Sequence, residues 1–173
     1  MAEQPTFAEL LAASQSSAVH LEMRDGYMLD DPELNRWREG HRLDLSRPEP
    51  WWQTWHDMLT PALERGVQVR RARVVSEPIS EYIRYEYDVT DVVNIAAGEA
   101  VRWLPRRHAT DLLLPGNDYW VFDDHTVQVI HFDGEGSFRE HEVIRDHDLA
   151  ERCIVAFEAV WERATPHKDY KPS

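Results

Sequence analysis

The sequence predicts a single α/β domain, residues 1–173, with a mixed β-sheet flanked by helices. Helical patterns with one apolar face alternate along the chain with short runs that have the two-residue period of a strand. Gly66 stands where a helix would give way to a strand. Residues 112–136 combine turn residues with aromatic and β-branched residues, which is typical of a hairpin. Alternation of helices and strands favours a layered α/β sandwich.

Composition narrows the class of protein. The 173 residues are 42% hydrophobic and 29% charged, as in ordinary globular domains. The single cysteine excludes an internal disulfide. The N-terminus has no basic segment followed by an apolar one, and no run reaches the ~18 apolar residues of a membrane span, so we expect a cytoplasmic protein without membrane contact. The net charge of −13 argues against direct nucleic-acid binding.

The two ends of the chain are expected to lie outside the core. Residues 1–49 are predicted to form an N-terminal helix and strand extension, with a helix capped by Thr6 and a half-buried strand at 18–24. A second short helix is predicted to begin at Pro32. The tail, residues 166–173, is expected to fray.

Residues 50–165 are expected to form the core. The helix at 50–65 carries a broad apolar face, and Pro61 should kink or split it because proline has no N–H to donate. The helix at 81–97 contains β-branched residues, which predict a break near residues 88–90. The other expected elements are strands at 67–75, 100–104 and 137–144, the hairpin at 112–136, and a last helix, capped by Asp146 or Asp148, that continues to about Ala164.

Arginines gather on two predicted strand regions of this acidic chain. In a strand, Arg71 and Arg73 point to the same face, so at least one guanidinium should be half-buried. Such a cluster suits a phosphate, a carboxylate or an acidic peptide. The more common alternative is an internal ion pair with Glu77, Glu81 or an aspartate of the hairpin. The cluster comprises Arg70, Arg71, Arg73, Arg102, Arg106 and Arg107.

Other candidate chemistry is weaker. Asp123 and Asp124 could supply a general base or part of a metal site, but neighbouring strand residues point to opposite faces. An Asp-Asp pair between two strands, together with His125, favours a tight turn. The histidines form no zinc-ligand motif, so no metal site is predicted. Cys153 lies on an apolar helix face, which favours an inert core residue. No phosphate-binding or dinucleotide motif is present, and no cofactor is expected.

Trp51, Trp52 and Trp55 are the best surface-binding candidates, although burial in the core is the default for a tryptophan. Consecutive residues of a helix point about 100° apart, so two different neighbours, or a second subunit, must bury the rings of Trp51 and Trp52. A homodimer that uses these tryptophans is therefore a further hypothesis.

Several segments together carry a resemblance that covers most of the chain. They are HLEMRDGYMLDDPEL, GVQVRRARVVSEPISEYIRYEYDVT, NIAAGEAVRWLPRR, LLLPGNDYWVFDD and AFEAVWERATPHKDY. In these segments the chain resembles an uncharacterised family of small acidic actinobacterial proteins, a domain of unknown function, encoded beside helix-turn-helix regulators. The resemblance implies kinship and a helix-turn-helix regulator as partner, but no activity.

The order of elements is similar, more remotely, to one half of the phospholipase D superfamily. That family has a hairpin with a catalytic His-x-Lys and a later aspartate. Aligning the aspartate with Asp124 places Asn117 at the nucleophilic histidine and Tyr119 at the lysine. Asparagine cannot form a phosphohistidine and tyrosine cannot supply the cation. The resemblance therefore implies a catalytically inactive, phospholipase D-like half domain, like the sensor domains of some regulators.

Two functional hypotheses follow. The first is a non-catalytic ligand-sensing or partner-binding protein that modulates a helix-turn-helix transcription regulator, with a small anionic ligand at the arginines. The second is a hydrolase or phosphotransferase that acts on a phosphate-containing substrate. Any site is expected where the start of the hairpin meets the arginine-bearing strands. The candidate ligand- or partner-binding residues are Arg71, Arg73, Arg102, Arg106, Asn117, Tyr119, Asp124, Trp51 and Trp52.

Overall fold

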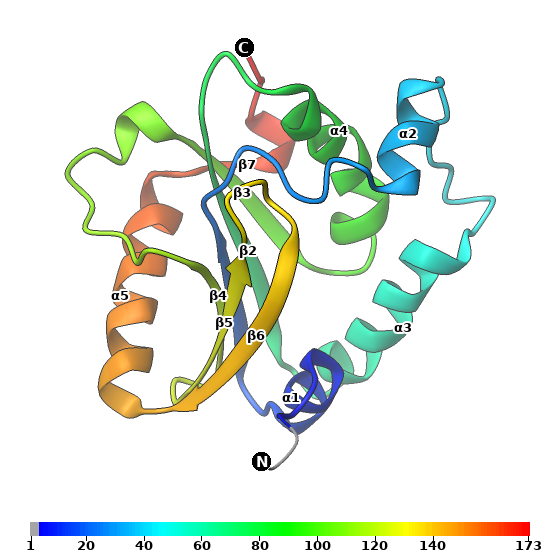
Figure 1. Ribbon diagram of the computed structural model, residues 1–173. Coiled ribbons are helices and arrows are strands. Elements are labelled where there is room, and N and C mark those ends of the chain that lie inside the picture. Colours follow the sequence, from blue (N-terminus) through cyan, green and yellow to red (C-terminus); the bar gives the residue numbers. More distant parts are fainter. Residues whose placement is uncertain (1–3) are drawn as a thin grey trace.

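A seven-stranded mixed sheet forms the centre of the domain in the computed structural model, which describes residues 4–173 (Figure 1). The strand order is β6-β5-β4-β1-β2-β3-β7. Strands β1 (Ser17–Glu22), β2 (Gln68–Val75) and β3 (Ala100–Pro105) pair in parallel, and every other pairing is antiparallel. The predicted α/β class with a mixed sheet is confirmed; residues 1–3 of the predicted domain lie outside the described residues. The remaining strands are β4 (Asp118–Phe122), β5 (Thr126–Phe132), β6 (Phe138–Arg145) and β7 (Thr165–Pro166).

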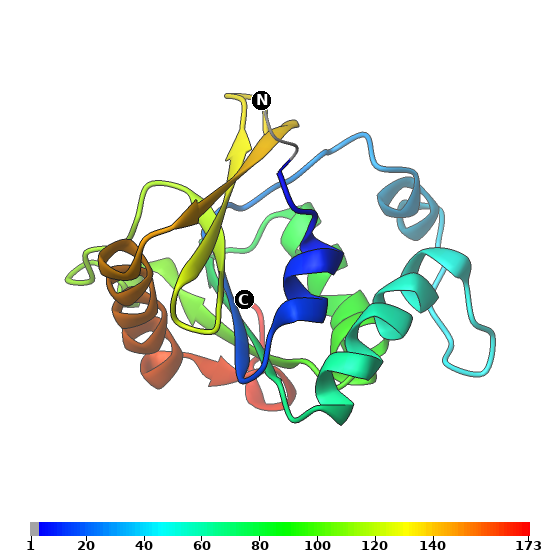
Figure 2. The same ribbon diagram turned by 90° about the horizontal axis from the view of Figure 1, so that it is seen from below.

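Helices cover both faces of the sheet. Figure 2 shows α5 (His147–Arg163) on one side, and α1 (Phe7–Ala13) with α3 (Pro50–Glu64) on the other. Helix α4 (Glu81–Thr90) lies on the same side as α3, and α2 (Pro32–Arg38) packs against α4. None of the helices formed by residues 4–173 is both long and apolar enough to cross a bilayer. Short turns complete the chain: the π-helical η1 (Asp91–Ile95) and the 3-10 turns η2 (Arg106–His108) and η3 (His167–Asp169).

Side-chain alternation along the strands divides the core into two layers. Tyr119 and Val121 of β4 pack toward α5, where they meet Phe157. Trp120 and Phe122 point to the opposite face, toward α1 and α3. Because helices cover both faces, polar strand residues that would face water in a one-sided sheet are buried here.

Local sequence signals explain most element boundaries. Thr6 and Glu9 form a capping box at α1. Asp123, Asp124 and His125 form the three-residue connection between β4 and β5. Asp123 and Asp124 have positive φ of 50° and 66°, and the His125 amide donates to the Phe122 carbonyl at 3.3 Å, which closes a tight turn. The predicted tight turn is thus confirmed. The helical hydrogen-bond pattern changes after Thr90, at the position of the predicted break.

The expected break at Pro61 is absent. Helix α3 runs from Pro50 to Glu64 through Pro61 without interruption. The proline lies in the last turn and is exposed, so only one backbone hydrogen bond is lost close to the helix end.

The two predicted peripheral segments belong to the core instead. Strand β1, assigned to an extension at 1–49, is the central strand between β4 and β2. The tail predicted to fray pairs with β3 through β7, and Tyr170 is only 5% exposed. Its ring stacks on Trp103 at 5.5 Å and its hydroxyl donates to Glu77 at 2.9 Å. One aromatic anchor therefore holds a polar tail in place.

Candidate functional site

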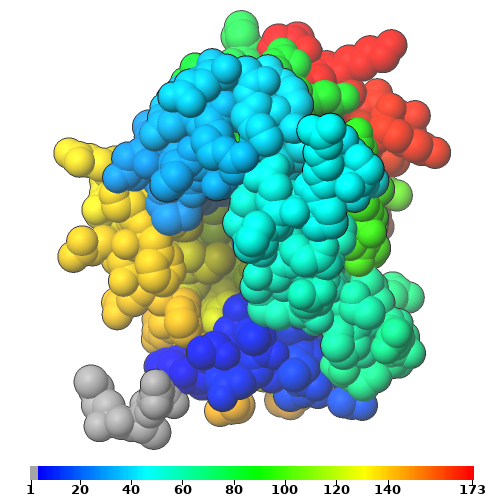
Figure 3. Space-filling view, turned by 90° about the vertical axis from the view of Figure 1, so that its right-hand side faces the viewer, coloured from blue at the N-terminus to red at the C-terminus, as the bar shows by residue number. Residues whose placement is uncertain are grey.

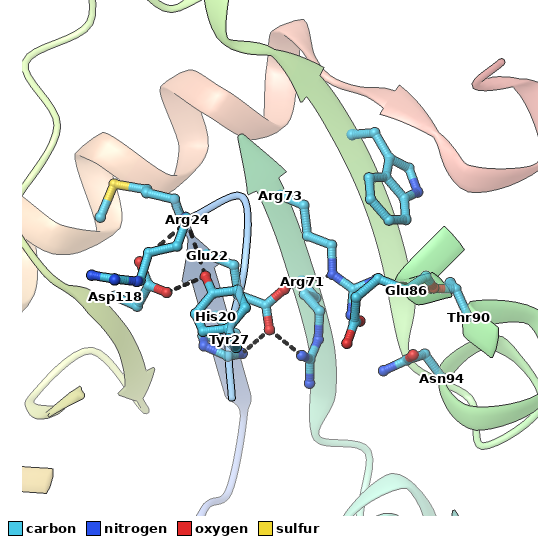
Figure 4. A network of polar contacts seen from close by, with 12 residues as sticks. His20, Glu22, Arg24, Tyr27, Arg71, Arg73, Glu86, Thr90, Asn94 and Asp118 are labelled. Carbon is cyan, nitrogen blue, oxygen red and sulfur yellow. Dashed lines mark hydrogen bonds and ion pairs between the residues drawn. The ribbon is translucent and has the colours of Figure 1, made fainter. Parts of the chain in front are cut away.

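Arg71 and Arg73 of β2 lie in an ion-pair network on the side of the sheet covered by α3 and α4 (Figure 4). Both guanidiniums donate to Glu22 of β1, and the Arg73 Nε–Glu22 Oε2 distance is 2.5 Å. Arg71 Nε donates to Glu99 Oε1 at 2.7 Å, and Arg73 Nη2 lies 2.5 Å from Glu86 Oε2. Arg71 and Arg73 are thus neutralised internally by Glu22, Glu86 and Glu99. Of the predicted partners, Glu77 pairs with another arginine of the cluster, Arg107, at 3.5 Å.

Because this network is buried, each of its charges would be costly to leave unpaired. Burial favours the neutral form of Glu22, but the Arg71 and Arg73 guanidiniums outweigh it and hold the pKa of that carboxyl well below its usual range. Glu99 is 2% exposed and also accepts from the Asn94 amide at 2.6 Å. Such a buried, fully paired network costs several kcal/mol when one member is removed.

His20 stands beside this network without a hydrogen bond. It is 5% exposed, and its ring stacks on Trp120 with centroids 4.3 Å apart. Neither ring nitrogen has a hydrogen-bond partner within the described part of the chain; the nearest carboxylate oxygen, Glu22 Oε1, is 3.6 Å from Nδ1. Burial, followed by the charge of Arg71, lowers the pKa of His20, so its imidazole is neutral at pH 7.

A second polar pair lies next to His20. The Tyr27 hydroxyl donates a short hydrogen bond to Asp118, whose other carboxylate oxygen accepts from the Met23 amide at 2.9 Å. Asp118 is 3% exposed, and burial raises its pKa to about 6 although the Tyr27 hydrogen bond opposes the shift. This carboxyl therefore changes charge near neutral pH.

These groups line a cleft over the sheet, which Figure 3 shows as a hollow between α1, α3 and the strands β5 and β6. The cleft contains two cavities with Ile130 in both walls. The first, the indole pocket, measures about 290 Å³ and is lined by Phe7, Trp55, Arg71, Trp120, Gln128, Ile130, Phe138 and His141. The second, the tyrosine pocket, measures about 180 Å³ and is lined by His20, Glu22, Tyr27, Met28, Tyr82, Glu86, Asp118, Ile130 and Phe132.

Comparison with known protein families identifies the domain. The model of a domain of unknown function, DUF6879, matches residues 5–172. The chain belongs to the DUF6879 family. No curated protein matches the sequence.

Solved structures show what the DUF6879 fold is similar to. Nuc of Salmonella typhimurium, a phospholipase D family member, aligns with a TM-score of 0.50 and 12% identity over 92% of this chain and 86% of that one. TrmBL2, an archaeal chromatin protein, aligns with a TM-score of 0.49 and 14% identity over 91% of this chain. The chain spans 47% of the TrmBL2 chain. At these identities the similarity to Nuc concerns the fold alone, and the predicted phospholipase D-like architecture agrees with it.

The DUF6879 structure does not bring the predicted site residues together. Tyr119 points to the α5 face, where its hydroxyl donates to the Cys153 carbonyl at 2.6 Å. Asn117 and Asp124 are both exposed and lie at opposite ends of β4. A shared cavity for Arg71, Arg73, Tyr119 and Asp124 is therefore ruled out by side-chain direction.

The other predicted residues have structural partners. Arg102 donates to the Trp161 carbonyl at 2.9 Å on the α5 face. Arg106 donates to the Met23 and Val74 carbonyls at 2.6 and 3.0 Å, which ties the ends of β1 and β2 together. Trp52 is 2% exposed and belongs to the core. Trp51 is half-buried in a shallow hollow of only about 10 Å³ between α2, α3 and α4. Of the nine, only Arg71 lines the cleft.

Sequence reasoning missed His20, Glu22, Tyr27 and Asp118. The available signal was the pair of ionisable residues in an otherwise apolar strand, Val19-His20-Leu21-Glu22. That alternation was interpreted as one solvated face, whereas helices cover both faces of β1. Among residues 4–173 no group of three His, Cys, Asp or Glu side chains is arranged to hold a metal ion.

Proposed function

We propose that this domain is a non-catalytic ligand-binding module that docks on a helix-turn-helix transcription regulator and modulates it. The observation that carries the proposal is the cleft. Its wall contains His20, which is only 5% exposed and whose two ring nitrogens have no hydrogen-bond partner among residues 4–173. An unpaired buried polar group costs about 1–3 kcal/mol, and a ligand that hydrogen-bonds to it recovers that cost. Such uncompensated groups favour function over packing as their explanation.

Residues of the hairpin support the proposal that the domain is not catalytic. If this fold acted like a phospholipase D, the residues aligned with the catalytic pair would be Asn117 and Tyr119. Asparagine is a poor nucleophile, and the Tyr119 hydroxyl already donates a hydrogen bond to the Cys153 backbone carbonyl in the core. The Cys153 thiol is itself buried, and burial raises its pKa, which disfavours the reactive thiolate.

The regulator as partner is supported by charge and by the family resemblance. A net charge of −13 suits a basic surface such as that of a DNA-binding domain, where the acidic protein would compete with DNA. The family resemblance implies a gene position beside a helix-turn-helix regulator, which makes such a neighbouring regulator the partner to test. Binding of the regulator does not require that the domain also binds a small ligand.

Co-purification tests the partner. The domain is co-expressed with the helix-turn-helix regulator encoded beside it, and an unrelated regulator of similar charge serves as the control. We expect a complex at micromolar concentration with the neighbouring regulator alone, and a weaker affinity of that regulator for its operator when the domain is added. No complex at micromolar concentration, or equal binding to the control, would contradict the proposal.

The alternative function, a hydrolase or phosphotransferase, is favoured only by the fold shared with Nuc over 92% of the chain. It is tested with a generic phosphodiester, bis(p-nitrophenyl) phosphate, on the wild type and on Asp124→Ala. Turnover that Asp124→Ala abolishes would replace the binding proposal. Equal background rates in the two proteins would eliminate the alternative.

A further inference from the structure

The tyrosine pocket is aromatic and acidic at once. Tyr27, Tyr82 and Phe132 contribute rings, and the Tyr27 ring lies 5.7 Å from Tyr82 and 5.1 Å from Phe132 between centroids. Aromatic faces carry a negative quadrupole that attracts cations within about 6 Å. The Arg24 guanidinium already lies 5.2 Å from the Phe132 ring centroid at the edge of this cluster, so the same attraction operates inside the protein.

The charges that line the pocket have one sign. Three carboxyl groups, those of Glu22, Glu86 and Asp118, are in its wall, and none of its described lining residues is Lys or Arg. Arg71 and Arg73 approach two of these carboxylates from the β2 side and are held by them. An anion entering the pocket would meet carboxylates first, which is unfavourable at short range. The anionic ligand expected from the arginine cluster does not suit this pocket.

His20 adds a neutral hydrogen-bond acceptor to the carboxyl groups of the pocket. It is only 5% exposed, lines the pocket, and has no hydrogen-bond partner at either ring nitrogen within the part of the chain that the structure describes. The tautomer with hydrogen on Nδ1 faces the Glu22 carboxylate at 3.6 Å and leaves the Nε2 lone pair as an acceptor. A ligand N–H would satisfy this acceptor, and a carboxylate or phosphate oxygen would not.

We propose that the tyrosine pocket binds a small primary ammonium ion, with its N–H groups directed to His20 and the carboxyls and its carbon chain against the tyrosines. The inference rests on the proposed ligand-binding function and names the ligand class. At about 180 Å³ the pocket is slightly larger than a cavity of ~150 Å³ that holds benzene, so the ligand has only a few carbon atoms beside the nitrogen.

Three probes of equal length test the charge requirement: butylammonium, 1-butanol and butyrate, each titrated at constant ionic strength. Binding is followed by NMR chemical shifts of the ring and indole resonances of Tyr27 and Trp120. We expect butylammonium to bind at least about tenfold more tightly than 1-butanol, since charge-assisted hydrogen bonds are about twice as strong as neutral ones. Butyrate should not bind.

Matched variants locate the site. Asp118→Asn removes a carboxylate from the pocket, and Asp124→Asn removes one from the exposed turn of the same hairpin. Asp118→Asn should weaken butylammonium binding about tenfold at pH 7.5, and Asp124→Asn should leave it unchanged. Phe132→Leu, which retains every carboxyl, provides a second variant with an expected loss of about threefold should Asp118→Asn fold poorly.

The outcomes separate this inference from the proposed function. Tighter binding of 1-butanol or butyrate, or an equal effect of Asp118→Asn and Asp124→Asn, overturns the ammonium class. If the resonances respond to none of the three probes but do respond to a low-molecular-weight cell extract, the ammonium class is wrong and the ligand-binding function stands. If they respond to neither the probes nor the extract, both are overturned.

Discussion

His20 and Trp120 are paired opposite each other on the antiparallel strands β1 and β4, and their rings stack 4.3 Å apart. The imidazole is therefore fixed by the indole rather than by a hydrogen bond. It lies between Trp120 and the tyrosine pocket. In this position its ring nitrogens would serve ligand binding but lower the stability of the free protein.

Replacing His20 with Phe tests this conflict. Phenylalanine retains the stack on Trp120 and removes two unpartnered nitrogens, so we expect the free energy of unfolding to rise by about 1 kcal/mol. Butylammonium binding should be lost in the same variant. Urea unfolding at pH 7.5 measures the first effect and the NMR titration the second. A less stable variant that still binds the amine would mean that His20 is an ordinary core residue.

Glu22 is the junction of the buried ion pairs, because it accepts from both Arg71 and Arg73. Glu22→Gln leaves two buried guanidiniums short of one negative charge, and we expect a loss of about 3–5 kcal/mol in the free energy of unfolding. Glu158→Gln is the matched control: it breaks the Arg70–Glu158 pair, where the glutamate side chain is 38% exposed, and should cost less than about 1 kcal/mol. Equal losses in urea unfolding would contradict the importance of burial.

Asp118 predicts a pH dependence of the opposite sign to that of Glu22. Its folded pKa is raised from 3.8 to about 6, chiefly by burial, so its contribution to stability is complete below pH 3.8 and is lost as the pH rises through about 6. Glu22, whose folded pKa is lowered by Arg71 and Arg73 against the effect of burial, instead loses its contribution as the pH falls below 4.5. The Asp118 carboxyl also faces Tyr27 and Arg24.

The difference between the wild type and Asp118→Asn isolates this group. From pH 4 to pH 7.5 the variant should gain up to about 3 kcal/mol in the free energy of unfolding relative to the wild type, because only the wild type must ionise a buried carboxyl. Urea unfolding at several pH values provides the comparison. A difference that does not change with pH would show that Asp118 has an ordinary pKa.

The polar tail provides a test of tertiary packing. Tyr170 stacks on Trp103 with ring planes 8° apart, and Trp103 Nε1 donates to His167 at 3.0 Å. Tyr170→Ala should lower the free energy of unfolding by about 3 kcal/mol, in the range of large-to-small core substitutions. Lys171→Ala, at the neighbouring exposed residue, should leave it unchanged. If Tyr170→Ala had no effect on thermal unfolding, the tail would be frayed as its composition suggests.

The pattern of apolar residues within single segments was sufficient to predict most of the helices and strands. The apolar period of α5, which includes Phe157 and Trp161, and the aromatic and β-branched run of β4 are visible in single segments of sequence. The docking of the tail was not, because residues 166–173 have no period, and only contact with Trp103 buries Tyr170. A contact between segments more than sixty residues apart leaves no signal in either one.

The candidate site was less predictable for the same reason. Arg71 and Arg73 were recognised, but their partners Glu22, Glu86 and Glu99 come from three other segments. Whether an arginine binds a ligand or an internal carboxylate depends on which residues the topology brings beside it. Because β1 lies at the centre of the sheet, its glutamate reaches these arginines and pairs with them. In a peripheral N-terminal extension, as predicted, that glutamate would not have reached them.

Asp123 and Asp124 provide the last prediction, since they are adjacent, chemically identical and both at positive φ. Asp123 accepts from the backbone amides of Gln15, Ser16 and Ser17, which lower its pKa against the effect of burial, whereas Asp124 is exposed. Asp123→Ala should therefore reduce the free energy of unfolding by about 1–3 kcal/mol more than Asp124→Ala, since alanine carries the same backbone strain at both positions. Urea unfolding of the two variants tests this difference directly. Equal effects would return both aspartates to the role of simple turn residues.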